Sequence, residues 1–172
     1  ALNAGYKPSD KILDEPISTG SWTPKNFANS YEGKISLERA FAISSNVAAV
    51  RLADSIGAEA IISQAKKLGI ISEITKEPSM ALGVSSLSLI EVSGSFGAIC
   101  GDGKPVIPFG LESIRLRSNE LIWKRETPQR KKIIKNKTLK SIKSLLREVV
   151  NQGTARKLSS LPFEIIGKTG TS

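Results

Sequence analysis

The chain has 172 residues, of which 40% are hydrophobic and 24% are charged, and 25 Lys and Arg against 16 Asp and Glu give it a net charge of +9. This size and balance suit a globular domain with its own core, while the charge favours anionic partners without choosing among them. The sequence contains no His, which excludes Ser-His and Cys-His catalytic sites and most zinc sites. Any general base must therefore be a Lys, a carboxylate, a Tyr or an activated Ser.

The first 34 residues are rich in Pro, Gly, Asn and Ser, so we expect irregular, extended chain with turns there. A helix is predicted to begin near Ser36, and two more are predicted over 47–56 and 58–68. The triplet Ser44-Ser45-Asn46 separates the first two, because these residue types are poor in helix interiors. It should therefore lie on a tight link between helices, where its polar groups can face a cleft.

Residues 70–86 are expected to form a loop, and the capping box Ser88-Leu89-Ile90-Glu91 predicts a helix over 89–99. Further along, the patterns predict a hairpin over 112–125 with Ser118-Asn119 at its turn, an amphipathic helix over 138–150 capped by Gly153, and a strand over 163–168. The Lys residues from 131 to 143 are interpreted as the solvated side of that helix and its approach. The single Cys100 follows Phe96 and Ile99 at helical spacing, and we expect it to be a buried structural thiol.

The triplet Lys168-Thr169-Gly170, which follows the apolar Phe163, Ile165 and Ile166, is one of three signatures of penicillin-interacting serine enzymes. Ser44-x-Asn46 matches a second. The third, Ser-x-x-Lys, carries the nucleophile and should precede both, but its one copy, Ser63-Gln64-Ala65-Lys66, comes after Ser-x-Asn and is interpreted as a coincidence. A phosphate-binding loop is disfavoured, because Pro162 stands where that motif needs a Gly.

Longer segments extend this pattern over nearly the whole chain. They are Trp22-Thr23-Pro24-Lys25-Asn26-Phe27, Tyr31-Glu32-Gly33, the run from Ala40 to Leu52 that holds the Ser-x-Asn triplet, Ala81-Leu82-Gly83, Val149-Val150-Asn151-Gln152-Gly153-Thr154-Ala155, and Gly167-Lys168-Thr169-Gly170-Thr171. In order and spacing the chain resembles the transpeptidase domain of high-molecular-weight penicillin-binding proteins. Gly153-Thr154 ahead of the Lys-Thr-Gly segment makes it most similar to the bifunctional class A members.

The resemblance implies an α/β fold of the α+β type, with helices packed on an antiparallel sheet as in the penicillin-binding transpeptidases and β-lactamases. It also implies that residues 1–172 are an interior part of a single transpeptidase domain, truncated at both ends, incomplete and inactive alone. The implied reaction is acyl transfer by a Ser at the D-Ala-D-Ala end of peptidoglycan stem peptides, which needs an activated hydroxyl, a proton donor and an oxyanion site.

By resemblance, the catalytic residues are Ser44, Asn46 and Lys168. Ser44 shuttles a proton toward the leaving nitrogen, Asn46 hydrogen-bonds the substrate backbone and the motif Lys, and Lys168 keeps the cleft positive. Thr169, Gly170 and Thr171 are implied to bind substrate: the two hydroxyls hold its carboxylate, the Thr171 N–H serves as an oxyanion donor, and Gly170 leaves room for the substrate.

The resemblance implies no cofactor and no metal. The implied partners are peptidoglycan stem peptides, β-lactams and other cell-wall synthesis proteins, with a membrane-anchored parent on the extracytoplasmic, periplasmic side of the bacterial inner membrane and no nucleic acid. Two other readings stay open at this point. One is a non-catalytic binding module or remnant with the same fold, and the other is a basic nucleic-acid-binding domain, which rests on the charge of +9 alone.

Overall fold

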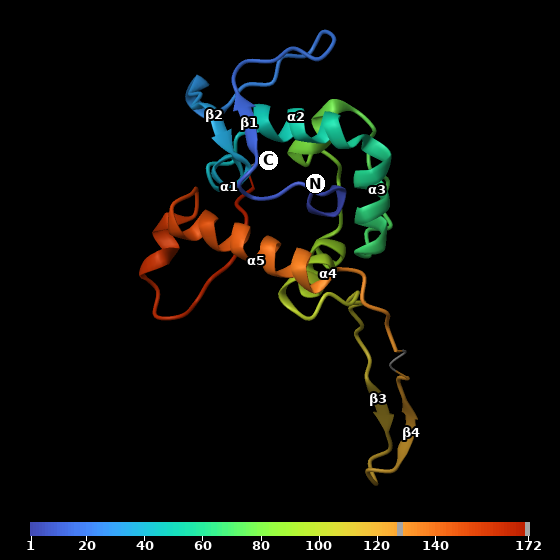
Figure 1. Cartoon of the computed structure of the whole chain (residues 1–172). Coiled ribbons are helices and arrows are strands. Elements are labelled where there is room, and N and C mark those ends of the chain that lie inside the picture. Colours follow the sequence, from blue (N-terminus) through green and yellow to red (C-terminus); the bar gives the residue numbers. More distant parts are fainter. Residues whose placement is uncertain (127–128, 171–172) are drawn as a thin grey trace.

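The computed structural model, shown in Figure 1, describes residues 1–126 and 129–170. The α-helices are α1 (Leu37–Ala42), α2 (Asn46–Ile56), α3 (Ala58–Lys67), α4 (Leu89–Cys100) and α5 (Asn136–Asn151). The strands are β1 (Lys11–Asp14), β2 (Gly33–Ser36), β3 (Ser113–Arg115) and β4 (Leu121–Lys124). Short 3₁₀ helices occupy Leu2–Ala4, Phe27–Asn29, Pro78–Leu82 and Arg156–Ser160. The predicted class, helices combined with antiparallel sheet, is confirmed.

The prediction of irregular chain over the first 34 residues is wrong in two places. Strands β1 and β2 pair antiparallel, with Ile12 opposite Ile35 and Asp14 opposite Gly33. Each strand has only four residues, and a long loop separates them, so neither shows the alternation that identifies a strand. The pair matters for the site because β2 ends at Ser36, the N-cap residue that immediately precedes α1.

The link between α1 and α2 has the tight geometry that the sequence predicts. The Ser36 hydroxyl caps α1 by accepting the Arg39 N–H, and the Ser45 hydroxyl caps α2 by accepting the Ala48 N–H. Between the helices, Ser44 has a φ of 59°, a left-handed conformation that is rare for residues with a side chain. Ser44 lies in the turn between the two helices and is exposed.

Helix α4 begins with the predicted capping box, in which Ser88 and Glu91 satisfy each other's backbone N–H groups. The Glu91 carboxylate also accepts the Ile71 N–H, and it accepts both the N–H and the hydroxyl of Ser72. These hydrogen bonds, led by that from the Ser88 hydroxyl, hold the pKa of Glu91 far below its usual range. Glu91 therefore fixes the loop after α3 to the start of α4.

The expectation of a buried thiol at Cys100 is wrong, because this residue is the last of α4 and is exposed. The helical spacing from Phe96 and Ile99 predicts Cys100 on an apolar face of the helix. Because α4 ends at Cys100, its side chain stays exposed. The Lys143 ammonium of α5 instead donates to the Cys100 and Gly101 carbonyls at 2.7 and 3.0 Å. A cation at these carbonyls satisfies acceptors that the end of a helix leaves free.

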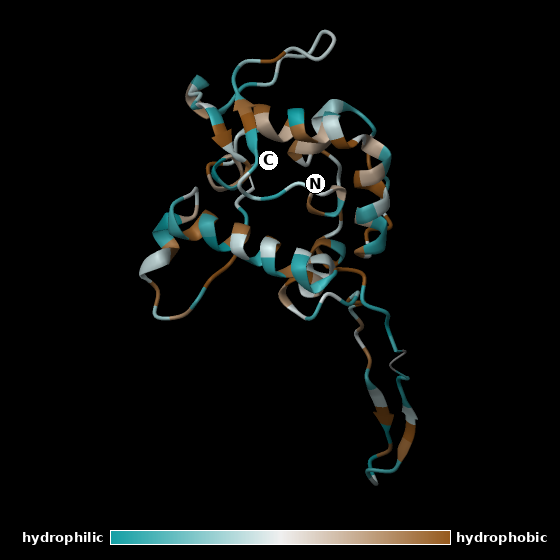
Figure 2. Cartoon of the chain, in the orientation of Figure 1, coloured by the Kyte–Doolittle hydropathy of each residue, from teal (hydrophilic) through white to brown (hydrophobic). Residues whose placement is uncertain are grey.

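The core lies along α5, which packs against α1 and α4, and around α2, which packs against α1, α3 and β1. Figure 2 colours the apolar residues of these helices brown. Val47, Ala98 and Val149 have no exposed surface, and the other buried aliphatic residues include Ala42, Ala48, Val50, Leu145, Leu146 and Val150. The amphipathic helix predicted over 138–150 is confirmed as α5, and its apolar stripe is buried at Leu139, Leu145, Leu146 and Val149 and half-buried at Ile142. Burial of this stripe is the main stabilisation available to the helix.

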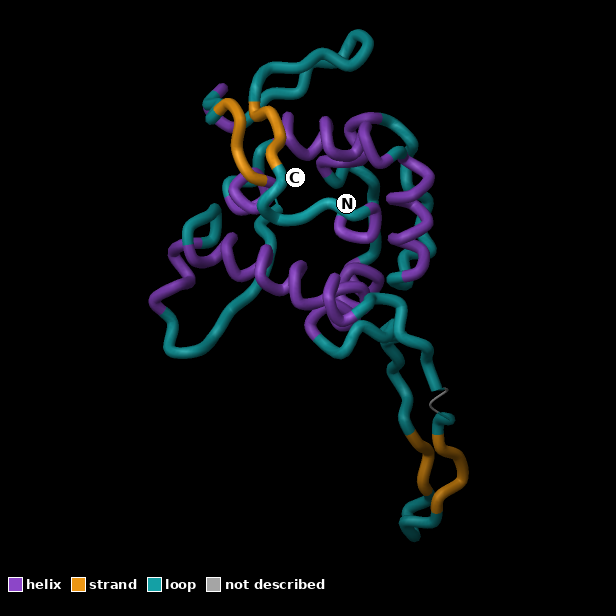
Figure 3. Tube along the Cα trace, viewed as in Figure 1, coloured by secondary structure: helices purple, strands orange, loops and turns teal. Residues whose placement is uncertain are grey.

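Strands β3 and β4 form the predicted hairpin, which projects away from the helices in Figures 1 and 3. Ile114 lies opposite Trp123, and Asn119 takes a left-handed φ of 69° at the predicted turn. Both strands are largely exposed to solvent.

The C-terminal segment contradicts the predicted strand over 163–168, because residues 163–170 form no strand (Figure 3). The Gly167 N–H donates to the Leu146 carbonyl at 3.4 Å, so the segment runs beside α5 instead of pairing in a sheet. The segment up to Gly170 then reaches the link between α1 and α2, where Lys168 contacts Ser44. No helix of the described part of the chain combines the length and the apolar character needed to cross a bilayer.

Candidate functional site

A lysine and a serine that are far apart in the sequence meet at the link between α1 and α2. The Lys168 Nζ lies 2.6 Å from the Ser44 Oγ, although the two residues are 124 positions apart. The left-handed turn at Ser44 presents its hydroxyl outward, and the extended segment beside α5 carries Lys168 to it. Two predicted site residues are thus brought into direct contact.

Lys168 is half-buried, and desolvation lowers the pKa of its ammonium. Its Nζ also contacts the Thr169 carbonyl at 3.2 Å and the Thr169 hydroxyl at 3.5 Å, and it lies 6.0 Å from the centre of the Phe41 ring. A partly desolvated cation held by oxygen atoms can donate a charge-assisted hydrogen bond to Ser44. The arrangement makes this corner of the molecule locally positive.

Asn46, the third predicted catalytic residue, is the first residue of α2 and is half-buried. Its side-chain amide donates to the Lys25 carbonyl at 2.8 Å, which ties α2 to the loop before β2. That amide is therefore engaged with the N-terminal loop, while Ser44 and Lys168 pair with each other.

Thr169 and Gly170 follow Lys168 and are both exposed. The Thr169 hydroxyl lies 2.6 Å from the hydroxyl of Thr154, a residue that the sequence did not single out for function. A Cβ added at Gly170 would meet nothing within 4 Å, so the space beside it is open. Thr171, predicted to bind substrate, lies outside the described residues.

Beneath the α1–α2 link lies a buried carboxylate that the sequence analysis missed. Asp14 has no exposed surface and accepts hydrogen bonds from Asn26 Nδ2 at 2.6 Å, Ser45 Oγ at 2.6 Å and the Glu32 N–H at 2.8 Å. The Asn26 Oδ1 in turn accepts the Val47 N–H at 3.2 Å. A buried carboxylate with this many donors is well satisfied, and it fixes the link from below. Asn26 belongs to a segment that carries the resemblance, which was the available signal.

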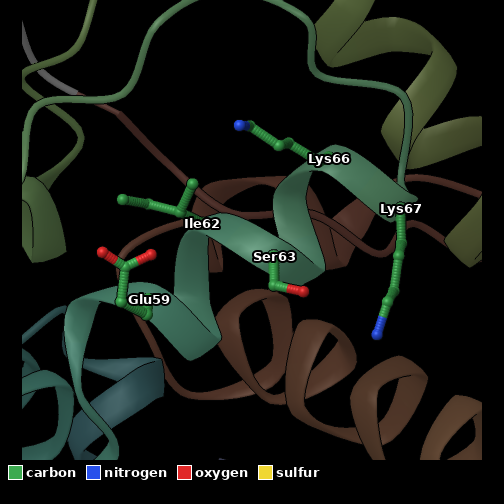
Figure 4. A pocket seen from close by; sticks show the side chains of 5 residues that line it. All are labelled: Glu59, Ile62, Ser63, Lys66 and Lys67. Carbon is green, nitrogen blue, oxygen red and sulfur yellow. The ribbon is translucent and has the colours of Figure 1, made fainter.

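The out-of-order Ser-x-x-Lys copy lies elsewhere, on α3. Ser63 and Lys66 line an open depression of about 430 Å³ together with Glu59, Ile62 and Lys67. Figure 4 shows the Ser63 hydroxyl and the Lys66 ammonium pointing in different directions. Both side chains are exposed, without the desolvation that activates a nucleophile and its base. This geometry supports the interpretation of Ser63-x-x-Lys66 as a coincidence.

The described residues include no group of three or more His, Cys, Asp or Glu side chains that could hold a metal ion. The polar groups at the site are the hydroxyls of Ser44, Thr154 and Thr169 and the ammonium of Lys168. Such a set can bind an anion and pass a proton to or from a bound ligand.

Comparison with known proteins identifies the family of the chain. The family described as "Penicillin binding protein transpeptidase domain" matches residues 1–172. Penicillin-binding protein 1A of Rickettsia bellii is 30% identical over 200 residues, which cover 100% of this chain and 25% of that protein. Penicillin-binding protein 1F of Bacillus subtilis is 31% identical over 170 residues, which cover 97% of this chain and 23% of that protein. The chain thus spans about a quarter of the length of these relatives.

Solved structures show the same fold. Penicillin-binding protein 1A from Haemophilus influenzae aligns with a TM-score of 0.89 at 20% identity, over 99% of this chain and 32% of that one. An imipenem acyl-enzyme complex of penicillin-binding protein A from M. tuberculosis aligns with a TM-score of 0.86 at 19% identity, over 99% of this chain and 45% of that one. With the family match over all 172 residues, the resemblance is confirmed, and the chain belongs to the penicillin-binding protein transpeptidase domain family.

Proposed function

We propose that this chain forms part of the acyl-transfer site of a serine-type peptidoglycan D,D-transpeptidase. In the reaction, a Ser Oγ attacks the carbonyl carbon of the D-Ala-D-Ala amide, the C–N bond breaks, and D-Ala leaves with an added proton. The amine of a neighbouring stem peptide then attacks the resulting ester and releases the Ser oxygen. We assign the attacking Ser to a Ser-x-x-Lys segment other than Ser63-x-x-Lys66.

The observation that carries this proposal is the 2.6 Å contact between Lys168 Nζ and Ser44 Oγ. An ammonium only donates hydrogen bonds, so it occupies an acceptor site of the Ser44 oxygen and leaves the hydroxyl proton free for another acceptor. The positive charge also makes that proton easier to release. Ser44 is thereby suited to protonate a leaving nitrogen, and Lys168 is suited to hold it in place and to restore its proton.

The remaining predicted residues take supporting roles in this proposal. Asn46 binds the substrate backbone and the lysine of the nucleophile motif. To do so, its side-chain amide gives up its hydrogen bond to the Lys25 carbonyl. Thr169 donates to the substrate carboxylate, and the open space beside Gly170 admits the substrate backbone. Thr171 is assigned a second hydroxyl for the carboxylate and an oxyanion N–H. Each role supplies a donor where negative charge resides or develops.

The same proposal sets the partners and the location. The ligands are peptidoglycan stem peptides and the β-lactams that mimic their D-Ala-D-Ala ends, with no nucleic acid. The reaction takes place on the extracytoplasmic, periplasmic side of the bacterial inner membrane, in a parent protein that is anchored there and works with other cell-wall synthesis proteins.

The test is acylation by a fluorescent penicillin in the full-length protein that contains this domain. Ser44→Ala and Lys168→Ala should each slow acylation by about 10²–10⁴-fold, the usual cost of losing one proton-transfer or preorganised electrostatic group. Ser63→Ala, which removes an exposed serine hydroxyl outside the site, is the matched control and should acylate at the wild-type rate. Rates within threefold of wild type for both site variants would refute the assigned roles, and a wild type that binds penicillin only reversibly would favour a non-catalytic binding module.

A further inference from the structure

Thr154 is held against the end of α1 by a backbone hydrogen bond and by the close approach of the preceding residue, Gly153, to α1. Its N–H donates to the Ala42 carbonyl at 3.1 Å. At the preceding Gly153, a Cβ would lie 2.2 Å from the same carbonyl oxygen, so no side chain fits there. Ala42 is the last residue of α1 and is two positions before Ser44. Thr154 is therefore placed relative to the proposed proton donor by contacts that leave little freedom.

The Thr154 side chain reaches the other half of the site. Its hydroxyl oxygen lies 2.6 Å from the Thr169 hydroxyl oxygen, which is a short separation for two neutral hydroxyls. Both threonines are exposed, so a ligand can approach the pair. Thr154 thus joins the end of α1 to the Lys168-Thr169 segment.

The direction of the hydrogen bond follows from what surrounds Thr169. A hydroxyl has one proton to donate and two lone pairs to accept with. The Lys168 Nζ, which only donates, lies 3.5 Å from the Thr169 Oγ1 and turns the Thr169 proton away from itself. If Thr154 also donates to the Thr169 Oγ1, the lone pairs of that oxygen face two donors. The Thr169 proton is then free to point at an incoming anion.

We propose that Thr154 is a positioning residue of the acyl-transfer site, whose hydroxyl donates to Thr169 and so directs the Thr169 O–H at the carboxylate of the bound substrate. The inference rests on the function proposed above and adds to it a residue that does not itself touch the substrate. When two hydroxyls form a chain in which the first donates to the second, the second is polarised and donates a stronger hydrogen bond to an anion than a single hydroxyl does.

The experiment compares two ligands on the full-length protein: a fluorescent penicillin with its free carboxylate and the same compound as its carboxamide. Acylation measured over a range of ligand concentrations separates the dissociation constant of the initial complex from the acylation rate constant. Thr154→Val keeps the shape of the side chain without the hydroxyl, and Thr154→Ser restores the hydroxyl. Thr23→Val is the matched control, because Thr23 is an exposed threonine whose hydroxyl pairs with that of Ser18 at 3.2 Å, in a different part of the chain.

Thr154→Val should weaken initial binding of the carboxylate ligand by about three- to tenfold, the usual loss for one hydrogen bond, and should leave the carboxamide ligand unchanged. Thr154→Ser and Thr23→Val should match wild type for both ligands. If Thr154→Val does not fold, Thr154→Ala takes its place. Equal weakening for both ligands, or a Thr154→Ser variant that behaves like Thr154→Val, would overturn the inference. If Ser44→Ala loses acylation while Thr154→Val binds both ligands like wild type, this inference alone is overturned. If neither variant differs from wild type, the proposed function is overturned as well.

Discussion

Lys168 is the residue whose charge state controls the proposed chemistry. Desolvation places its pKa below the ordinary lysine value of 10.5. The protonated form donates to Ser44, so activity that depends on this hydrogen bond should fall as the pH rises through the lowered pKa. The same shift acts on stability in the opposite sense. Below the folded-state pKa, burial of the charged ammonium is a cost, and this cost disappears as the pH rises from that pKa toward the unfolded-state value.

We therefore expect the acylation rate of the full-length protein to decline on the alkaline side at a pH below 10.5. Lys168→Arg keeps a cation that stays charged over this range, so its decline should move to higher pH even if its maximal rate is lower. The pH profile of penicillin acylation, measured for both proteins, checks this. Identical alkaline limbs for wild type and Lys168→Arg would show that another group controls the decline.

Residues were predictable where a motif fixes both type and order. Ser44 and Lys168 were paired by their signatures and lie 2.6 Å apart. Asp14 escaped prediction because a buried carboxylate depends on donors from Asn26, Ser45 and Glu32, which only the fold brings together. Gly153 was predicted as a helix cap, but its φ is not positive, and the reason for the glycine is its close approach to Ala42.

That close approach gives a prediction at the scale of elements, because it is where α5 meets α1. Gly153→Ala should place its Cβ 2.2 Å from the Ala42 oxygen and force the two helices apart. We expect this overpacking to lower the free energy of unfolding by about 1–3 kcal/mol. Gly110→Ala is the control, because a Cβ there meets nothing within 4 Å. Urea unfolding followed by circular dichroism compares them, and equal midpoints would show that the contact relaxes without cost.

Helices and strands were predictable where the interactions that form them lie within a short stretch of sequence. The five helices follow from apolar periodicity and from caps such as Ser45 and the Ser88–Glu91 box, which act within a few residues. The hairpin over 112–125 also has its turn and both strands in one short segment. Strands β1 and β2 were missed because each needs a partner from across a long loop. The apolar residues before Lys168 suggested a strand, yet no strand pairs with them in the described chain.

At the scale of the whole molecule, the order of the motifs was more informative about the family than the composition was. The net charge of +9 allowed several anionic partners. Of the Lys residues from 131 to 143, five are exposed as predicted for the solvated side of α5 and its approach, namely Lys131, Lys132, Lys135, Lys137 and Lys140. Lys143 is instead half-buried and donates to the Cys100 and Gly101 carbonyls. The order of the segments from Trp22 to Gly170 instead identified one family, which the match over residues 1–172 confirmed. Motif order also sets Ser63-x-x-Lys66 aside, in agreement with the exposed and divergent side chains of Ser63 and Lys66 on α3.

These 172 residues, expressed by themselves, should form no covalent adduct with a fluorescent penicillin. Ser63 is exposed on α3, and the ammonium of Lys66 points away from its hydroxyl (Figure 4). The Ser44 hydroxyl accepts a hydrogen bond from a cation, which makes it a proton donor and a poor nucleophile. Mass spectrometry after incubation is the measurement, with the full-length protein as the positive control. An adduct on Ser63 that disappears in Lys66→Ala would make the α3 depression a second reactive site, and an adduct on Ser44 would replace its role as a proton shuttle with that of a nucleophile.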